Sequence, residues 1–259
     1  MNHAVRFKPA TGTVVSPPPL GATEIHLWSA GLEASPKRLE QLAALLSPEE
    51  QARAERYRFE RHRRRYQITW GLTRSLLGQY AATEPRALSF SFGSNGKPSL
   101  AEPASWLEFN ISHSGERVVL AVTSTWPVGV DIEQLRPVED ARDIARRFFS
   151  DSEVRALEDL DAAHRLEGFF NCWTRKEALI KAVGEGVFVS LDRFDVSLAP
   201  GEPARLVSLD GQPADPERWH LVHLTPEPTM VGALATPARP GSVRAWELDI
   251  EHQSIVAPD

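Results

Sequence analysis

Two carboxylates placed two residues apart could hold a hard cation. The segment "GVDIEQ" (129–134) alternates apolar with polar residues, as a strand does when one of its faces is buried. Asp131 and Glu133 therefore project together from the face opposite the valines. Such a pair is costly on a buried strand unless a cation neutralises it, and Mg²⁺ binds a few carboxylate oxygens while keeping other positions for water and phosphate. A strand with one solvated face is the alternative interpretation.

A third carboxylate and a lysine stand in "NCWTRKEALIKAVGEG" (171–186), which is helix-forming sequence. Glu177 and Lys181 follow Trp173 at steps of four, so the three side chains stack on one side of a helix, at the border of its apolar stripe. The two charges are either an i,i+4 pair on a solvated edge, which contributes about 0.2–0.5 kcal/mol, or part of a site. In a site, Glu177 supplies a third oxygen if the helix packs across the end of the strand.

Groups that could bind an anion occur in three other segments. In "NISHSG", Ser112, His113 and Ser114 stand at an expected tight turn whose backbone N–H groups would form a phosphate cradle. Lys97 follows a glycine in "NGKP", and residues 53–66 hold seven arginines against two glutamates. The alternatives are a turn histidine bonded to the backbone, an exposed loop lysine and a solvated helix face. Together with the carboxylates, these groups are the parts needed to bind a magnesium-bridged pyrophosphate.

An α+β arrangement of helices and strands is expected to position these groups. The residues "SPEE", beginning at Ser47, have the form of a capped helix start, and helical sequence continues to about Tyr80 as two helices. The segment 107–124 predicts a hairpin with one strand ending near Ser112 and the turn formed by 113–116. The other expected elements are a strand over 24–30, a strand and glycine turn over 87–100, and helices over about 138–149, 151–161 and 163–184.

A faint internal repeat suggests two similar α+β halves. When Trp70 is laid on Trp173, "WGLTRSLLG" lies over "WTRKEALIK" and the leucine and isoleucine positions of the apolar stripes match. Strand sequence follows each helix. We therefore expect a division near Trp126, with an N-terminal half over 1–126 and a C-terminal half over 127–259 that carries the carboxylates.

Composition favours a cytoplasmic enzyme or binding protein. The chain has 259 residues, 42% hydrophobic and 25% charged, which is ordinary for a globular protein. Its single cysteine, Cys172, excludes an internal disulfide framework and a cysteine-based zinc site. A net charge of −6 argues against nucleic-acid binding by bulk charge, and no run of eighteen apolar residues predicts a membrane span.

The order of the motifs resembles that of the Sfp-type 4′-phosphopantetheinyl transferases, in the holo-carrier-protein synthase superfamily. "NGKP", "FNISHSG", "GVDIEQ" and "WTRKEALIKA" occur in the family's order over roughly residues 47–190. The resemblance implies a pseudo-dimer of two α+β halves, with coenzyme A in the cleft between them. It implies transfer of the phosphopantetheine arm of coenzyme A to a serine of an apo acyl or peptidyl carrier protein, with release of 3′,5′-ADP. The working ion would be Mg²⁺, with Mn²⁺ as an alternative, and the protein a monomer that binds neither nucleic acid nor membrane.

A carrier serine needs a base, and we expect Glu177 to be that base, acting directly or through a metal-bound water, with Lys181 binding the reacting phosphate. Where relatives often carry lysines near the start of the first helix, this chain has Glu50 and Arg53, of which only Arg53 can replace a phosphate-binding lysine. The full assignment is Asp131, Glu133 and Glu177 for the metal, and Arg53, Arg65, Gly96, Lys97, Pro98, Ser112, His113 and Lys181 for coenzyme A.

Two functions of other classes are alternatives. A magnesium-dependent phosphohydrolase acting on coenzyme A or nucleotides could use the same three carboxylates without any carrier protein. A non-catalytic module could bind an acidic carrier protein through the arginine-rich segment 53–66, although this would leave the carboxylates unexplained.

Overall fold

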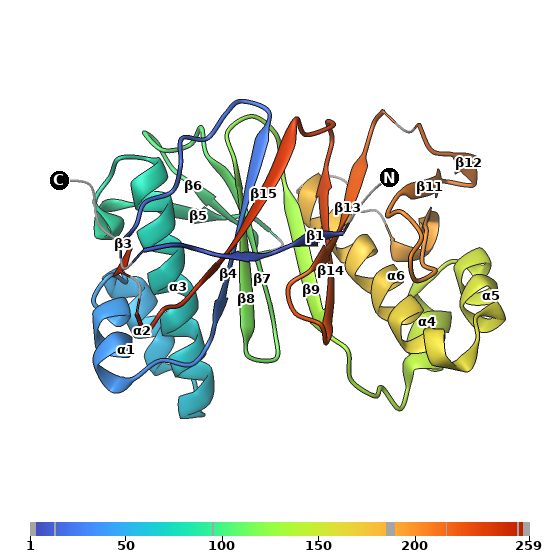
Figure 1. Ribbon diagram of the computed structural model, residues 1–259, viewed down its shortest axis with the longest axis horizontal. Helices are drawn as coiled ribbons and strands as arrows, with labels where there is room; N and C mark the ends of the chain where they lie inside the picture. Colours follow the sequence, from blue (N-terminus) through green and yellow to red (C-terminus); the bar gives the residue numbers. More distant parts are fainter. Residues whose placement is uncertain are drawn as a thin grey trace.

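The strands lie in the middle of the structure and the helices lie at its two ends (Figure 1). The structure is a computed structural model, and it describes residues 4–12, 14–94, 96–184, 190–215, 217–252 and 254–255. Helices α1 (Pro36–Ala43), α2 (Pro48–Glu55) and α3 (Glu60–Tyr80) cover one side of the strands. Helices α4 (Ala141–Phe148), α5 (Asp151–Asp159) and α6 (Ala162–Val183) cover the other. Among the described residues, no helix is both long and apolar enough to cross a bilayer.

The same order of elements occurs twice along the chain. Each half contains, in this order, a strand, three helices, a short 3₁₀ helix, a small antiparallel sheet and a longer hairpin, and the strands nearest the two chain ends lie outside this repeat. In the first half the helices are followed by η1 (Pro85–Ala87), β5 (Phe90–Phe92), β6 (Pro98–Leu100), β7 (Glu108–Ser114) and β8 (Arg117–Thr123), after β4 (Glu24–Gly31) at its start. In the second half β9 (Gly129–Gln134) comes first, and η2 (Leu191–Arg193), β10 (Phe194–Val196), β11 (Leu206–Leu209), β12 (Gln212–Pro213), β13 (His220–Thr225) and β14 (Met230–Thr236) come last. The prediction of an α+β pseudo-dimer is confirmed.

The two large sheets repeat the same core of three strands. One sheet has the order β2-β15-β4-β8-β7 and the other β1-β13-β14-β9, so β4-β8-β7 corresponds to β9-β14-β13. Each sheet also contains a strand from the opposite end of the chain. Near the N-terminus, β1 (Val5–Arg6) pairs with β13 of the second half. Near the C-terminus, β15 (Ser242–Leu248) pairs with β4 of the first half and with β2 (Lys8–Pro9). A short pair joins β3 (Val14–Val15) to β16 (Ser254–Ile255). The boundary at residue 126 stays a prediction, and these terminal strands cross it.

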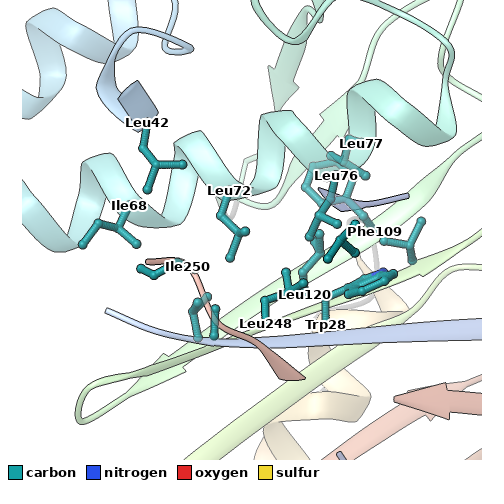
Figure 2. Packing of buried hydrophobic residues seen from close by; sticks show 14 of the residues in the cluster. Trp28, Leu42, Ile68, Leu72, Leu76, Leu77, Phe109, Leu120, Leu248 and Ile250 are labelled. Atoms are coloured by element: carbon teal, nitrogen blue, oxygen red, sulfur yellow. The ribbon is translucent and has the colours of Figure 1, made fainter. Parts of the chain in front are cut away.

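Three large hydrophobic clusters lie between the layers, and a fourth, smaller one contains Tyr66 and Trp70. Figure 2 shows the first, in which Leu72 and Leu76 of α3 pack over Trp28, Phe109 and other residues of the five-stranded sheet. The second surrounds α6 and includes the phenylalanines of α4, α6 and β10. The third lies between the two sheets, and its members are Ile25, Leu27, Val119, Ala121, Val128, Val130, Ile132, Leu224, Met230, Leu234 and Ala245. This central cluster joins the halves because it takes apolar residues from both β4 and β9.

Each half also contains one buried ion pair, formed by a helix-capping glutamate. Ser47 and Glu50 form the expected capping box of α2, and Glu50 accepts from Arg74 of α3 at 2.6 Å. In the second half the capping glutamate of α5 is Glu153, whose partner is Lys176 of α6, at 2.7 Å. Glu50 is thus a structural residue.

The hairpin differs from the sequence prediction. β7 does not end near Ser112 but continues to Ser114, and Ser112, His113 and Ser114 pair with β8. The turn is therefore only Gly115 and Glu116, and Gly115 adopts the positive φ of +57° that the first position of a two-residue turn favours. The expected turn is wrong for His113 and Ser114, and so is the phosphate cradle built on it, because Ser112, His113 and Ser114 belong to a strand.

Candidate active site

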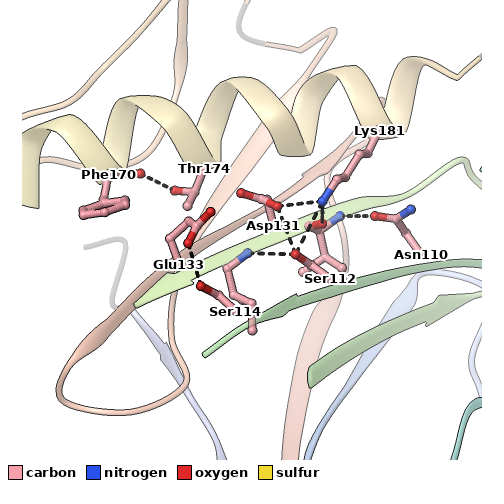
Figure 3. Close-up of polar contacts among 10 residues, drawn as sticks. Asn110, Ser112, Ser114, Asp131, Glu133, Phe170, Thr174 and Lys181 are labelled. Atoms are coloured by element: carbon pink, nitrogen blue, oxygen red, sulfur yellow. Dashed lines mark hydrogen bonds and ion pairs between the residues drawn. The ribbon is translucent and has the colours of Figure 1, made fainter. Parts of the chain in front are cut away.

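Close packing of α6 on β9 creates the site. Gly129 begins β9 without a side chain, and a Cβ at this position would collide with the carbonyl oxygen of Ala178 in α6. The glycine lets the helix cross directly over the strand. As a result, Asp131 and Glu133 of β9 lie beneath the helix face that carries Lys181 (Figure 3). The condition under which Glu177 could join the site, that this helix packs across the strand, is met.

Asp131 is the most buried of the three carboxylates, with 6% of its surface exposed. Its Oδ1 accepts from the Lys181 ammonium at 2.6 Å and from the Ser112 hydroxyl at 2.9 Å. Its Oδ2 is buried and has no hydrogen-bond partner among the described residues. Burial raises the pKa of Asp131, while Lys181 and Ser112 act in the opposite direction.

Glu133 and Glu177 complete an acidic group around Asp131. Burial raises the pKa of Glu133, although a 2.6 Å bond from the Ser114 hydroxyl acts against this. Burial also raises the pKa of Glu177, and the negative charges of Asp131 and Glu133 raise it further. The three carboxylates thus influence one another electrostatically, and the Lys181 ammonium contacts Asp131 and lowers the pKa of all three.

A divalent cation fits this chemistry. The site carries excess negative charge and an unpartnered buried oxygen on Asp131, and both favour a hard cation with oxygen ligands. Within the described ranges, however, no three Asp, Glu, His or Cys side chains are already arranged in metal-binding geometry. The metal assignment of Asp131, Glu133 and Glu177 therefore stays a prediction.

A separate open pocket of about 420 Å³ lies among α2, α3, β6 and β7. It brings together four residues that the sequence assigned to coenzyme A: Arg53, Arg65, Pro98 and His113. Desolvation lowers the pKa of His113, and the charge of Lys181 lowers it further. Since Lys181 also contacts Asp131, the pocket and the acidic group are close neighbours.

Arg65 has a further partner at the pocket rim. Its guanidinium forms an ion pair with Glu116 of the β7–β8 turn. Arg53 instead lies over two aromatic rings, 5.8 Å from the centroid of Tyr66 and 6.0 Å from that of Phe92. Both guanidinium groups line the pocket, so both can meet an anion there.

The structure places Lys97, Gly96 and Ser112 in other surroundings. The Lys97 ammonium donates to the carbonyl oxygen of Lys181 at 2.7 Å and to that of Val128 at 3.2 Å, and burial lowers its pKa. Lys97 thereby ties the loop before β6 to the last turn of α6. Gly96 has a positive φ of +74° in this loop. The Ser112 hydroxyl is engaged by Asp131 and by the backbone N–H of Ile132, at 3.3 Å.

Sequence reasoning missed several residues of the site. The aromatic lining of the pocket includes Tyr57, Tyr66 and Trp70. Trp70 was noticed only as a marker of the repeat, although an aromatic residue beside clustered arginines is itself a signal for a site that binds anions and bases. Ser114, which bonds Glu133, was assigned only to the turn, but its two-residue spacing from Ser112 could have placed both on one strand face.

Comparison with known proteins gives a consistent result. The family description "4′-phosphopantetheinyl transferase superfamily" matches residues 127–235, and "4′-phosphopantetheinyl transferase, N-terminal" matches residues 30–125. The 4′-phosphopantetheinyl transferase HetI of Nostoc sp. is 37% identical over 248 residues, which cover 95% of this chain and 99% of the relative. Two Bacillus proteins are similar over shorter stretches. The 4′-phosphopantetheinyl transferase psf-1 of Bacillus pumilus is 38% identical over a stretch that covers 66% of this chain and 71% of the relative. The 4′-phosphopantetheinyl transferase Sfp of Bacillus subtilis is 33% identical over a stretch that covers 61% of this chain and 69% of the relative.

Proposed function

Because the chain belongs to the 4′-phosphopantetheinyl transferase superfamily, we propose that it transfers phosphopantetheine from coenzyme A to a serine of an apo acyl or peptidyl carrier protein. The serine oxygen forms a bond to the phosphorus of the phosphopantetheine group, and the bond from this phosphorus to the ADP oxygen breaks. The second product is 3′,5′-ADP. The observation that carries the proposal is the acidic group beside a basic, aromatic pocket, since a pyrophosphate that bridges the two requires both.

Asp131, Glu133 and Glu177 would hold the metal. A bound Mg²⁺, or Mn²⁺ in its place, would neutralise charge on the pyrophosphate and on the leaving oxygen of ADP. The excess negative charge and the unpartnered Oδ2 of Asp131 support this role.

Glu177 serves as the proton acceptor for the carrier serine. A serine hydroxyl is a weak nucleophile at its ordinary pKa and needs a base within hydrogen-bond reach. Burial and the neighbouring charges of Asp131 and Glu133 raise the pKa of Glu177, which makes this carboxylate a stronger base than a solvated one. Lys181 lies one helical turn further and is 28% exposed, so its ammonium can meet the reacting phosphate and offset charge as the bond breaks.

The pocket takes the nucleotide end of coenzyme A. Arg53, Arg65 and His113 supply donors for its phosphates. Pro98, which lines the pocket, and the preceding loop with Gly96 would lie against the adenine. Both sites lie within one chain that contains two halves, which supports a monomer as the working unit.

The test is incubation of the purified protein with coenzyme A, Mg²⁺ and a panel of apo carrier proteins, read by intact-mass spectrometry. We expect a mass gain of one phosphopantetheine, abolished by EDTA and by Asp131→Asn. Asp195→Asn is a matched control, because Asp195 is a strand carboxylate bonded to Ser208 in β11, away from the site. Breakdown of coenzyme A without a gain on any carrier would favour the phosphohydrolase. Intact coenzyme A with no gain would favour the binding module.

A further inference from the structure

Side chains, rather than a backbone ladder, join the two halves at the site. β7 is the edge strand of the five-stranded sheet and β9 the edge strand of the four-stranded sheet. Asn110, Ser112 and Ser114, at alternate positions of β7, accept from backbone N–H groups of β9. The three distances are 2.8 Å from Val130, 3.3 Å from Ile132 and 3.1 Å from Gln134. The two-residue step is the same on both strands, so these bonds set the register of β9 against β7.

Each of the two serine hydroxyls also donates a hydrogen bond to a carboxylate of β9. The Ser112 hydroxyl accepts from the N–H of Ile132 and donates to Asp131 at 2.9 Å. The Ser114 hydroxyl accepts from the N–H of Gln134 and donates to Glu133 at 2.6 Å. In each case the carboxylate belongs to the residue just before the bonded N–H. A hydroxyl with its acceptor and donor both engaged has one orientation, and a bond to an ionised acceptor is stronger than a neutral one.

These bonds fix one oxygen of each acidic side chain. Asp131 also has Lys181 to hold it, at 2.6 Å. Glu133 forms no ion pair among the described residues, and the Ser114 hydroxyl donates a hydrogen bond to its carboxylate at 2.6 Å. The orientation of Glu133 therefore depends on Ser114 more than that of Asp131 depends on Ser112.

We propose that Ser114 is a positioning residue, which holds Glu133 toward Asp131 and Glu177 so that the three carboxylates can bind a divalent cation. This rests on the proposed function. Ser114 contacts neither pyrophosphate nor metal in this role and acts only through Glu133. Groups that orient metal ligands in this way typically change metal affinity about 10- to 100-fold when they are removed.

The experiment measures Mn²⁺ binding to the full chain, with no coenzyme A or carrier protein present, by the electron paramagnetic resonance signal of free Mn²⁺. We expect Ser114→Ala to raise the dissociation constant about 10- to 100-fold. Ser114→Thr, which keeps the hydroxyl, should restore most of the affinity. Ser208→Ala is the matched control, since the Ser208 hydroxyl donates to the strand carboxylate of Asp195 at 2.7 Å, outside the site. It should bind Mn²⁺ as the wild type does.

Unchanged Mn²⁺ affinity in a folded Ser114→Ala protein would overturn the positioning role alone, and transfer to carrier proteins would be unaffected. A wild-type protein that binds no Mn²⁺ would overturn the metal assignment and the positioning role together. Circular dichroism and thermal unfolding of each variant establish that it is folded. If Ser114→Ala unfolds, Ser114→Thr against Ser114→Val, which has the same shape without the hydroxyl, makes the same comparison.

Discussion

Removing the charge of Lys176 should be among the most destabilising substitutions in this protein. Lys176 is 0% exposed and Glu153 3% exposed, and they form an ion pair at 2.7 Å. The same ammonium also donates to the carbonyl oxygens of Leu191, at 2.6 Å, and Phe194. Lys176→Met keeps the length of the side chain but leaves a buried carboxylate without its counter-charge and two carbonyl oxygens without this donor.

The expected loss is about 3–5 kcal/mol in the free energy of unfolding, the range for breaking one side of a buried pair. For a chain of this size, this corresponds to a fall in the midpoint of thermal unfolding of roughly 6–20 °C. Arg193→Met is the matched control, because its ion pair with Asp210 is 57% and 52% exposed and should contribute only about 0–1 kcal/mol. Urea unfolding followed by circular dichroism measures both.

A double-mutant cycle separates the charge pair from the other bonds. Glu153→Gln alone should also destabilise, since Glu153 accepts from the backbone N–H groups of Ser150 and Val196 at 2.9 and 2.8 Å. Lys176→Met combined with Glu153→Gln should cost less than the sum of the single changes, because no unpaired charge remains buried. If the free energies of unfolding of Lys176→Met and Arg193→Met differ by less than about 1 kcal/mol, burial does not make the Lys176 pair stronger than an exposed pair, and the reasoning is refuted.

Three other outcomes are expected. Glu177→Gln should lower the transfer rate about 100-fold or more with little change in stability, and near-normal turnover in the purified variant would remove Glu177 from the role of base. Gly129→Ala should lower the free energy of unfolding by about 1–3 kcal/mol, because the added Cβ would collide with the Ala178 carbonyl oxygen. An unchanged midpoint of urea unfolding would show instead that α6 can move away from β9. Burial lowers the pKa of His26 from its usual 6.5 to about 4. Between these values the unfolded chain binds a proton that the folded chain does not, so the free energy of unfolding should fall as pH falls through this window, by up to about 3 kcal/mol. His26→Gln should make that part of the pH profile less steep, and the slope that remains comes from His223, whose pKa burial also lowers to about 4. An equally steep profile in the variant would exclude His26 as a cause.

Local patterns predicted the elements well but not the contacts between distant segments. The alternation around Asp131 and the helical spacing of Glu177 and Lys181 depend only on neighbours in sequence, and the structure contains both elements. The pairing of β15 with β4 and the bonds of Lys97 to α6 join segments far apart in the chain, for which periodicity has no signal.

Buried cations are a second limit of sequence reasoning. Arg74 of α3 and Arg175 and Lys176 of α6 are almost completely buried, although charged side chains are rarely buried in proteins. Arg74 and Lys176 are tolerated because a capping glutamate lies opposite each of them. Arg175 donates to the carbonyl oxygen and hydroxyl of Ser197. Such partners belong to other elements, so composition and helical spacing could not reveal them.

The repeat also explains why the acidic group occurs on one side of the pseudo-dimer. In β4, Ile25 and Leu27 enter the central cluster, as Val130 and Ile132 do in β9. The alternating positions that carry Asp131 and Glu133 in β9 are therefore occupied in β4 by His26 and Trp28.

His26 and Trp28 close the corresponding position in the first half. The His26 ring nitrogen Nδ1 and the Trp28 indole nitrogen lie 2.7 and 2.8 Å from the Tyr80 hydroxyl, which belongs to α3, the counterpart of α6. Both side chains are nearly fully buried, and the carboxylate of Glu24 lies 3.5 Å from Nε2 of His26. This position therefore lacks the group of carboxylates that would bind a cation. The protein should accordingly bind about one Mn²⁺ per chain, and Asp131→Asn should abolish that binding without exposing a second site. Two equivalent Mn²⁺ ions per chain in an equilibrium titration would contradict this account of how the two halves diverged.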